Sequence, residues 1–83
     1  MSATKKVVIV TGASQGIGAA VAEAYRKRGY SLVAIARSMP SSDDPEVLAL
    51  SGDLAQPGTG ARAVVRAMER FGRVDTVVNN AGV

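Results

Sequence analysis

The segment Val7–Gly18, VVIVTGASQGIG, constrains the fold of this 83-residue chain more than any other stretch. Its first four residues, Val7–Val10, are all apolar and β-branched, which is typical of a strand buried on both faces. Thr11 and Gly12 end the run, and a helical pattern begins after a glycine-rich turn. A strand, a glycine turn and a helix start bring backbone N–H groups and the positive end of a helix dipole together. The segment therefore predicts a binding site for an anion such as a phosphate group.

The three glycines of this turn have different predicted roles. Gly12 permits the tight turn off the strand, Gly16 lets a pyrophosphate approach the backbone, and Gly18 lets the helix pack closely on the strand. Their spacing, G-x-x-x-G-x-G, differs from the usual dinucleotide fingerprint G-x-G-x-x-G. No Lys followed by Ser or Thr comes after the second glycine, so the turn is not a Walker phosphate loop. The alternative interpretation is a tight turn without a ligand.

Two motifs of the chain resemble those of one enzyme family. The stretch Thr11–Gly18, TGASQGIG, resembles the TGxxxGxG motif of the short-chain dehydrogenases/reductases. Asn79–Gly82, NNAG, resembles the NNAG motif of the same family. Their order and separation suit a β-α-β unit followed by a second crossover. The resemblance covers nearly the whole chain, but only the amino-terminal half of the family's domain.

Apolar patterns predict four strands and two helices. The predicted strands are residues 7–10, 30–36, 47–51 and 74–79, and the predicted helices are residues 16–28 and 59–71. Ser38–Glu46, SMPSSDDPE, is polar and contains two prolines. It is therefore predicted to be a loop with one helical turn at most, where many relatives have a helix. The predicted apolar helix stripes are Ile17, Val21, Ala24 and Tyr25 in the first helix, and Ala61, Val64, Met68 and Phe71 in the second.

These elements define an α/β fold class. Right-handed crossovers give the amino-terminal half of a Rossmann-like, doubly wound parallel sheet with strand order 3-2-1-4. The two helices then lie on opposite faces. Residues 1–83 are expected to form the amino-terminal dinucleotide-binding part of a single domain. The two motifs meet at one crevice, because both follow strands beside the point where the winding reverses.

The resemblance implies that the glycine turn binds the cofactor's pyrophosphate, mainly through backbone N–H groups. The residues expected there are Ser14, Gln15, Gly16, Ile17 and Gly18. The residue after the second strand selects the cofactor: a carboxylate accepts the ribose 2′-OH of NAD, whereas a cation pairs with the 2′-phosphate of NADP. NAD-dependent relatives have an Asp where this chain has Ala36, and Arg37 follows, with no carboxylate before Asp43. We therefore expect NADP, with NAD as the less favoured cofactor; the alternative for Arg37 is a surface arginine without a ligand.

The resemblance also implies contacts to the adenosine. Asp53 matches the family's aspartate near the adenine amino group, with Leu54 beside the ring; the alternative is a loop or cap aspartate. Asn79 and Asn80 help to fix the central strand in the family, whereas Ala81 and Gly82 approach the adenosine ribose. The expected cofactor-binding residues are thus Gly12, Ser14, Gln15, Gly16, Ile17, Gly18, Arg37, Asp53, Leu54, Asn80, Ala81 and Gly82.

The catalytic residues that the resemblance implies are missing from this chain. The family transfers hydride between nicotinamide C4 and a carbonyl or secondary alcohol, using Ser, Tyr and a Lys four residues after the Tyr. Tyr25 is followed at that spacing by Gly29, and Tyr30 by Ala34. We therefore expect no catalytic residue and no activity in this chain alone. The chemistry, the small carbonyl or alcohol substrate and a homo-oligomeric assembly would belong to the intact protein.

An alternative of another class is a non-catalytic dinucleotide-binding module that acts as a sensor or partner subunit. A Ser and a Tyr-x-x-x-Lys motif beyond Val83 would favour the oxidoreductase.

Composition excludes several other functions. The chain has no Cys and no His, so disulfides, thiol or imidazole chemistry and an ordinary zinc site are not expected. Its net charge of +3 is scattered rather than clustered, so we expect no nucleic-acid partner. The N-terminal MSATKK leads into an apolar run too short for a signal peptide, and no run is long enough to cross a membrane. A cytoplasmic location without a membrane partner is the expectation.

Overall fold

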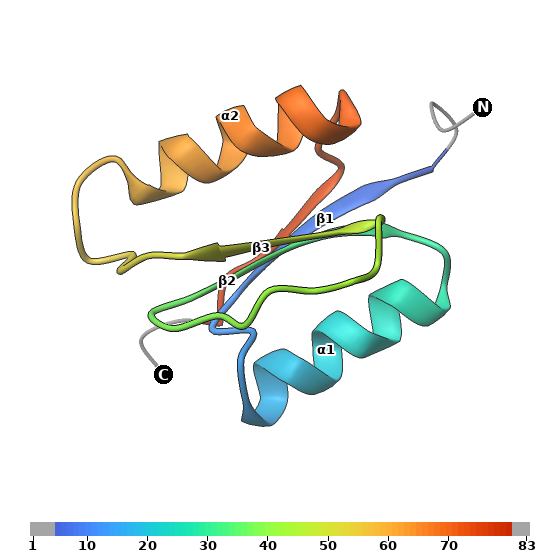
Figure 1. Cartoon of the computed structure of the whole chain (residues 1–83), viewed down its shortest axis with the longest axis horizontal. Helices are drawn as coiled ribbons and strands as arrows, with labels where there is room; N and C mark the ends of the chain where they lie inside the picture. The colour runs from blue at the N-terminus through green and yellow to red at the C-terminus, as the bar shows by residue number, and fades with distance from the viewer. Residues whose placement is uncertain (1–4, 81–83) are drawn as a thin grey trace.

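A computed structural model describes residues 5–80 of the chain. Its elements are β1 (Val7–Thr11), α1 (Gly16–Lys27), β2 (Ser31–Ala36), β3 (Val47–Ser51), α2 (Thr59–Phe71) and β4 (Thr76–Val78). The strands form one parallel sheet of order β3-β2-β1-β4. The two helices cover opposite faces of this sheet (Figure 1). The predicted fold class, strand order and helix placement are confirmed.

The central strands β1 and β2 are buried along their whole length. Their side chains alternate between two hydrophobic clusters, as the period of a strand requires. One cluster joins Val8, Val10, Leu32 and Ala34 to Ala22 of α1. The other cluster lies under α2 and consists of Ile9, Val33, Ile35, Leu48, Leu50, Ala63 and Ala67. The chain is thus a three-layer arrangement in which the sheet supplies most of the core.

The prediction of which face of α2 packs into the core is wrong. The side chains that enter the core are Ala63 and Ala67, whereas Val64 and Met68 are 44% and 48% exposed. Small side chains let the helix axis approach the sheet closely, and the neighbouring face is then turned toward solvent. Of the predicted stripe, Phe71 alone packs against the core, and only partly. In α1, Val21 and Tyr25 pack as predicted.

Two predicted members of the α1 stripe do not reach the core. Ile17 is 71% exposed, and Ala24 is also exposed.

The segment between β2 and β3 contains no helix, as predicted, and runs along the α1 face of the sheet (Figure 1). No helix within residues 5–80 has the length and apolar character needed to cross a membrane.

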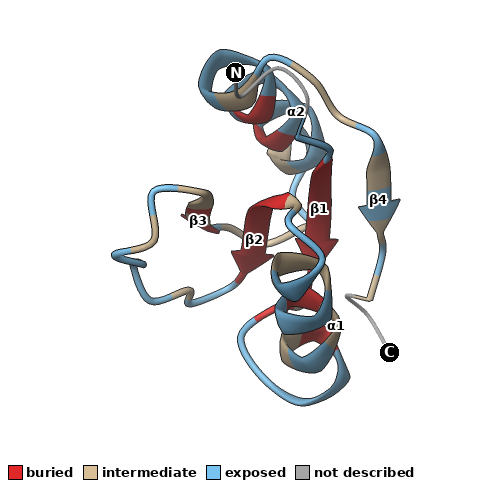
Figure 2. Cartoon of the chain, turned by 90° about the vertical axis from the view of Figure 1, so that its right-hand side faces the viewer, coloured by how far each residue is buried: buried red, intermediate tan, exposed pale blue. Residues whose placement is uncertain are grey.

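Strand β4 is shorter than predicted and lies at the edge of the sheet. It pairs with β1 through three residues, Thr76–Val78, and has no strand on its other side within the described chain. Figure 2 shows that β1 and β2 are buried, whereas β4 is only intermediate or exposed. Val77 is 58% exposed. An apolar, unpaired edge of this kind is a known site of association between chains.

Polar groups tie the strands together at the edge where β1 begins. The Asp75 carboxylate accepts the Val7 N–H at 2.8 Å and two hydrogen bonds from the Arg73 guanidinium at 2.8 and 2.6 Å. The Arg73 hydrogen bonds, followed by the one from Val7, lower the pKa of Asp75 below its ordinary value of 3.8. Similarly, the Ser31 hydroxyl, 2.6 Å from the Glu46 carboxylate, lowers the pKa of Glu46.

Because the pKa of Asp75 is lowered on folding, its ionised form stabilises the folded state above pH 3.8, and this contribution is lost as the pH falls through the lowered value. We predict that Asp75→Asn lowers the thermal midpoint of the intact protein (the whole polypeptide that its gene encodes) at about pH 7. The difference from wild type should shrink as the pH falls below 3.8 and passes through the lowered pKa of Asp75. Asp43→Asn, in an exposed loop position, is the matched control. It should change neither the thermal midpoint nor its dependence on pH. An Asp75→Asn difference that stays constant with pH would refute this role.

Candidate functional site

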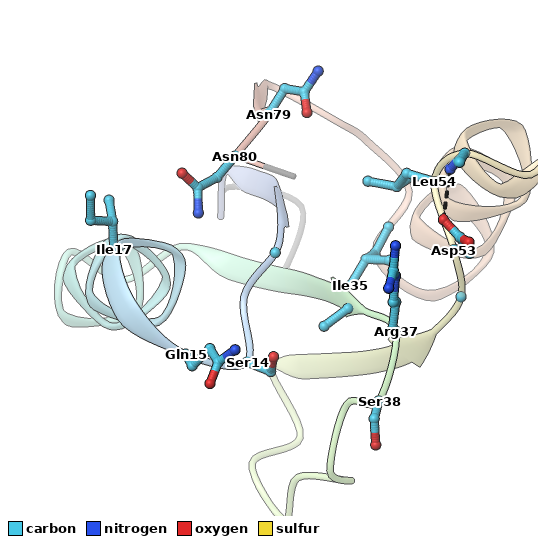
Figure 3. Close-up of a pocket in the computed structure, with 14 residues that line it drawn as sticks. Ser14, Gln15, Ile17, Ile35, Arg37, Ser38, Asp53, Leu54, Asn79 and Asn80 are labelled. Carbon is cyan, nitrogen blue, oxygen red and sulfur yellow. Dashed lines mark hydrogen bonds between the residues drawn. The ribbon is translucent and has the colours of Figure 1, made fainter. Parts of the chain in front are cut away.

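A cleft of about 950 Å³ lies at the edge of the sheet where the strands end. All four strands are parallel, so the segments that follow them meet at this edge. The helices leave β1 and β3 toward opposite faces, which places the cleft at the point where the winding reverses. Its lining residues are Gly12, Ser14, Gln15, Ile17, Ile35, Ala36, Arg37, Ser38, Gly52, Asp53, Leu54, Ala55, Asn79 and Asn80 (Figure 3).

The turn requires glycine for two reasons, which are backbone conformation and close packing. Gly12 and Gly16 have φ angles of +64° and +62°, in the left-handed region that favours glycine. At Gly18, a Cβ atom would lie 1.9 Å from the Gly12 carbonyl oxygen, so only glycine allows α1 this close to the end of β1. By contrast, a Cβ atom at Gly16 would have no atom of the described chain within 4 Å. The space above Gly16 is therefore open.

The first turn of α1 presents backbone N–H groups without competing side chains. Gln15 is the N-cap residue and makes no side-chain capping hydrogen bond in the described structure. The first turn also contains no acidic residue. The N–H groups that begin a helix have no partner within it, and they carry the positive end of its dipole. This end of α1 is therefore suited to a phosphate group of a ligand.

A buried hydroxyl joins the glycine turn to the segment after β4. Thr11 is 5% exposed, and its Oγ1 accepts the Asn80 N–H at 2.7 Å. The same oxygen lies 3.2 Å from Asn79 Oδ1, to which it donates. These contacts give Thr11 a structural role. They also hold Asn80 beside Gly12, where an added Cβ atom would lie 3.4 Å from the Asn80 Nδ2 atom.

Arg37 is the positively charged side chain of the cleft. It follows Ala36 at the end of β2, is exposed, and extends toward the side of the cleft that carries Asp53 and Leu54 (Figure 3). Within residues 5–80, no carboxylate lies within ion-pair distance of Arg37. An arginine with no acidic partner can form a bidentate contact with a phosphate group of a ligand.

Asp53 is held in a turn after β3. Its Oδ1 accepts the Ala55 N–H at 2.9 Å, and its carbonyl oxygen accepts the Thr59 hydroxyl at 2.8 Å. Among the described residues, Oδ2 accepts no hydrogen bond. The cap-like contact and the predicted contact with an adenine amino group are thus compatible, because each needs a different carboxylate oxygen.

The structure brings most of the predicted site residues together. Eight of them line the cleft: Gly12, Ser14, Gln15, Ile17, Arg37, Asp53, Leu54 and Asn80. Gly16 and Gly18 do not line it: Gly16 is exposed, and Gly18 is buried. Ala81 and Gly82 lie outside the described residues. Four further residues line the cleft and were not predicted from the sequence: Ile35, Ser38, Gly52 and Ala55. Each lies within two positions of a predicted site residue, which was the only available signal.

No group of three or more acidic, Cys or His side chains within residues 5–80 is arranged to hold a metal ion. The charged groups that line the cleft are one cation, Arg37, and one carboxylate, Asp53; its other polar side chains are the hydroxyls and amides of Ser14, Gln15, Ser38, Asn79 and Asn80.

Comparison with known proteins identifies the family. A profile of the short chain dehydrogenases matches residues 6–83. The chain belongs to the short-chain dehydrogenase/reductase family. The solved short-chain dehydrogenase/reductase of Serratia marcescens superposes with a TM-score of 0.83 and is 37% identical over 94% of this chain and 36% of its own. The resemblance found in the two motifs is confirmed.

The chain is similar to the amino-terminal portion of longer enzymes. The 11-beta-hydroxysteroid dehydrogenase A of Sesamum indicum is 40% identical over 94% of this chain, which spans 25% of that protein. The L-rhamnose 1-dehydrogenase (NAD(P)(+)) of Sphingomonas sp. is 37% identical over 94% of this chain and 35% of that protein. The chain therefore spans about a quarter to a third of the length of these relatives.

Because a side chain at Gly16 would enter open space, a substitution there tests ligand binding without disturbing the hydrophobic core. We predict that Gly16→Val abolishes dinucleotide binding by the intact protein, because the branched side chain would occupy the space above the turn. The left-handed φ adds a stability cost of about 1–2 kcal/mol.

Gly29→Val is the matched control for Gly16→Val. Gly29 has a φ of +89°, no atom within 4 Å of the place where a Cβ would lie, and a position after the far end of α1. It should show a similar loss of thermal stability with unchanged binding, measured by fluorescence titration with NADPH. Equal affinities of the two variants would mean that the glycine turn contacts no cofactor.

Proposed function

We propose that this chain is the NADP(H)-binding portion of a short-chain oxidoreductase. The single observation that carries this proposal is Arg37, which lies in the cleft directly after Ala36, at the end of β2, and has no acidic partner among residues 5–80. The family uses NAD or NADP, and the two differ only at the ribose 2′ position. A carboxylate at the end of β2 would repel a 2′-phosphate, whereas a guanidinium would bind it.

The dimensions and the polar groups of the cleft support a dinucleotide. Its volume of about 950 Å³ lies in the range of ordinary ligand sites. The open space over Gly16 would admit the pyrophosphate against the first turn of α1. Ser14 and Gln15 line one side, and Asp53 and Leu54 line the other, at the place proposed for the adenine (Figure 3). The described residues therefore supply contacts for the adenosine and pyrophosphate portions.

The residues of this chain would bind and orient the cofactor. When bound, NADP(H) supplies a hydride donor or acceptor at its nicotinamide ring. The Thr11–Asn80 contact would keep the end of β4 beside the glycine turn and so hold the cleft in one shape. The Asp53 Oδ2 atom would accept a hydrogen bond from the amino group of the adenine. Arg37 and Ser38 would face the ribose 2′-phosphate.

We predict that the intact protein binds NADPH more tightly than NADH by at least about 1.4 kcal/mol, a tenfold difference in Kd. Arg37→Ala should erase this preference by weakening NADPH binding alone, and Arg37→Asp should erase it as well. Arg28→Ala is the matched control, because it removes an exposed positive charge at the other end of α1. Titrations of both cofactors measure the ratio. Equal Kd values in the wild type would contradict the proposed NADP preference.

We further propose that the reactive groups lie outside residues 1–83. Neither Tyr25 nor Tyr30 precedes a Lys at the family's spacing, and neither residue lines the cleft. This chain covers only 25% and 36% of the length of two of the relatives, so most of each enzyme lies outside the matched portion. A substrate of the carbonyl or secondary alcohol class would then meet its acid or base on that additional part, while this chain holds the cofactor.

The prediction for residues 1–83 in isolation follows from their exposed apolar surface. The edge strand β4 has Val77 exposed, and the outer face of α2 exposes Val64, Val65 and Met68. We expect the isolated chain to self-associate, to unfold over a broad temperature range and to show no NADPH oxidation with carbonyl substrates. Size-exclusion chromatography, thermal unfolding and cofactor absorbance test these points. A monomer with a sharp transition would refute the folding claim, and turnover above background would refute the placement of the chemistry.

A further inference from the structure

We propose that Ser51 is a positioning residue for the loop that carries Arg37, and that it thereby sets the preference for NADP(H) over NAD(H). This inference rests on the proposed function, because it assigns a role in binding the ribose 2′-phosphate. Ser51 is the last residue of β3 and does not itself line the cleft. Its effect on the cofactor would pass through the backbone of the neighbouring loop.

The hydroxyl of Ser51 continues the pairing of β2 with β3 beyond the end of the ladder. The register of the two strands ends at Ala36 opposite Ser51, and the Gly52 N–H then donates to the Ala36 carbonyl at 2.9 Å. The Met39 N–H donates to Ser51 Oγ at 3.0 Å. The same hydroxyl lies 3.4 Å from the Met39 carbonyl, to which it donates. The hydroxyl of Ser51 thus serves as the hydrogen-bond partner of the Met39 backbone, where no further strand residue of the described chain pairs with it.

These contacts fix both ends of a two-residue span. Ala36 is held by the strand ladder, and Met39 is held by Ser51 and by packing of its side chain against the cluster under α1. Arg37 and Ser38 lie between these two anchors, are exposed, and line the cleft. The backbone that carries them is therefore anchored on both sides, although their side chains face solvent.

Ser51 is held in turn through its own backbone. The Arg62 guanidinium of α2 donates to the Ser51 carbonyl oxygen at 2.9 Å, and it packs so closely over Gly52 that a Cβ there would lie 2.8 Å from Arg62 Nη2. The anchor of the Arg37 loop is thereby connected to a helix on the opposite face. A loop held in its binding conformation before the ligand arrives loses less conformational entropy on binding. Because NADH lacks the 2′-phosphate, this gain applies to NADPH alone.

The test uses two variants of nearly identical shape. Ser51→Thr keeps the hydroxyl, whereas Ser51→Val removes it, and both side chains suit a strand. We expect the Kd of the intact protein for NADPH to be about fivefold weaker in Ser51→Val than in Ser51→Thr, the equivalent of one ordinary hydrogen bond. The Kd for NADH should agree within about twofold. Amide hydrogen exchange at Met39 should be faster in Ser51→Val.

A double-mutant cycle and a control complete the design. In an Arg37→Ala background, the difference between Thr and Val at position 51 should disappear, because the loop would no longer carry the cation. Ser42→Ala removes a hydroxyl from the same loop, where it accepts the Asp44 N–H, and should leave both Kd values unchanged.

Three results would overturn the inference. Equal NADPH affinities of the Thr and Val variants would show that the hydroxyl does not position the loop. Equal losses for NADPH and NADH would show that Ser51 only supports the sheet. If Arg37→Ala leaves NADPH binding unchanged, both this inference and the NADP proposal fail. If Arg37→Ala weakens NADPH binding while the Thr and Val variants are equal, only the role of Ser51 fails.

Discussion

The close approach of helix α1 to strand β1 at Gly18 is the constraint on which the rest of the structure depends. A Cβ atom at this position would lie 1.9 Å from the Gly12 carbonyl oxygen, so any side chain would push the start of the helix away from the sheet. Because the helix begins so close to the end of β1, its unpaired N–H groups and its positive dipole end face the cleft. The proposed anion site is thus a consequence of packing between two elements.

The cleft is completed by contacts between segments far apart in the sequence. Thr11 and Asn80 are 69 residues apart, and their hydrogen bond keeps the end of β4 beside the glycine turn. Asp53 is held by Ala55 and Thr59, so its other carboxylate oxygen, Oδ2, has a defined position. The cleft therefore has few ionisable groups, and most of its shape comes from backbone. Such a site is suited to holding a cofactor, and the reacting groups are proposed to lie outside this chain.

Local sequence predicted those features that depend on single elements. The apolar run before Gly12 and the glycine spacing indicated the first strand and the turn that follows it, and the order of the predicted elements then indicated the topology. The inward face of α2 was not predictable in this way. Val64 and Met68 are more hydrophobic than Ala63 and Ala67, but close packing on the sheet favours the smaller pair. The contacts that shape the candidate site were also beyond a single-sequence analysis. The hydrogen bond between Ser51 and Met39 depends on the path of an irregular loop, so no periodicity indicates it.

The central claim is that the edge where the strands end binds a dinucleotide phosphate through the glycine turn. The most direct measurement is a titration of the isotope-labelled intact protein with NADPH, followed by the chemical shifts of its backbone amides. The account predicts that the perturbed amides are those of residues 12–18, 37–38, 53–54 and 80, while residues 44–46 and 70–75 at the opposite edge are unaffected. Unchanged amides in the glycine turn, or shifts concentrated at the opposite edge, would contradict it.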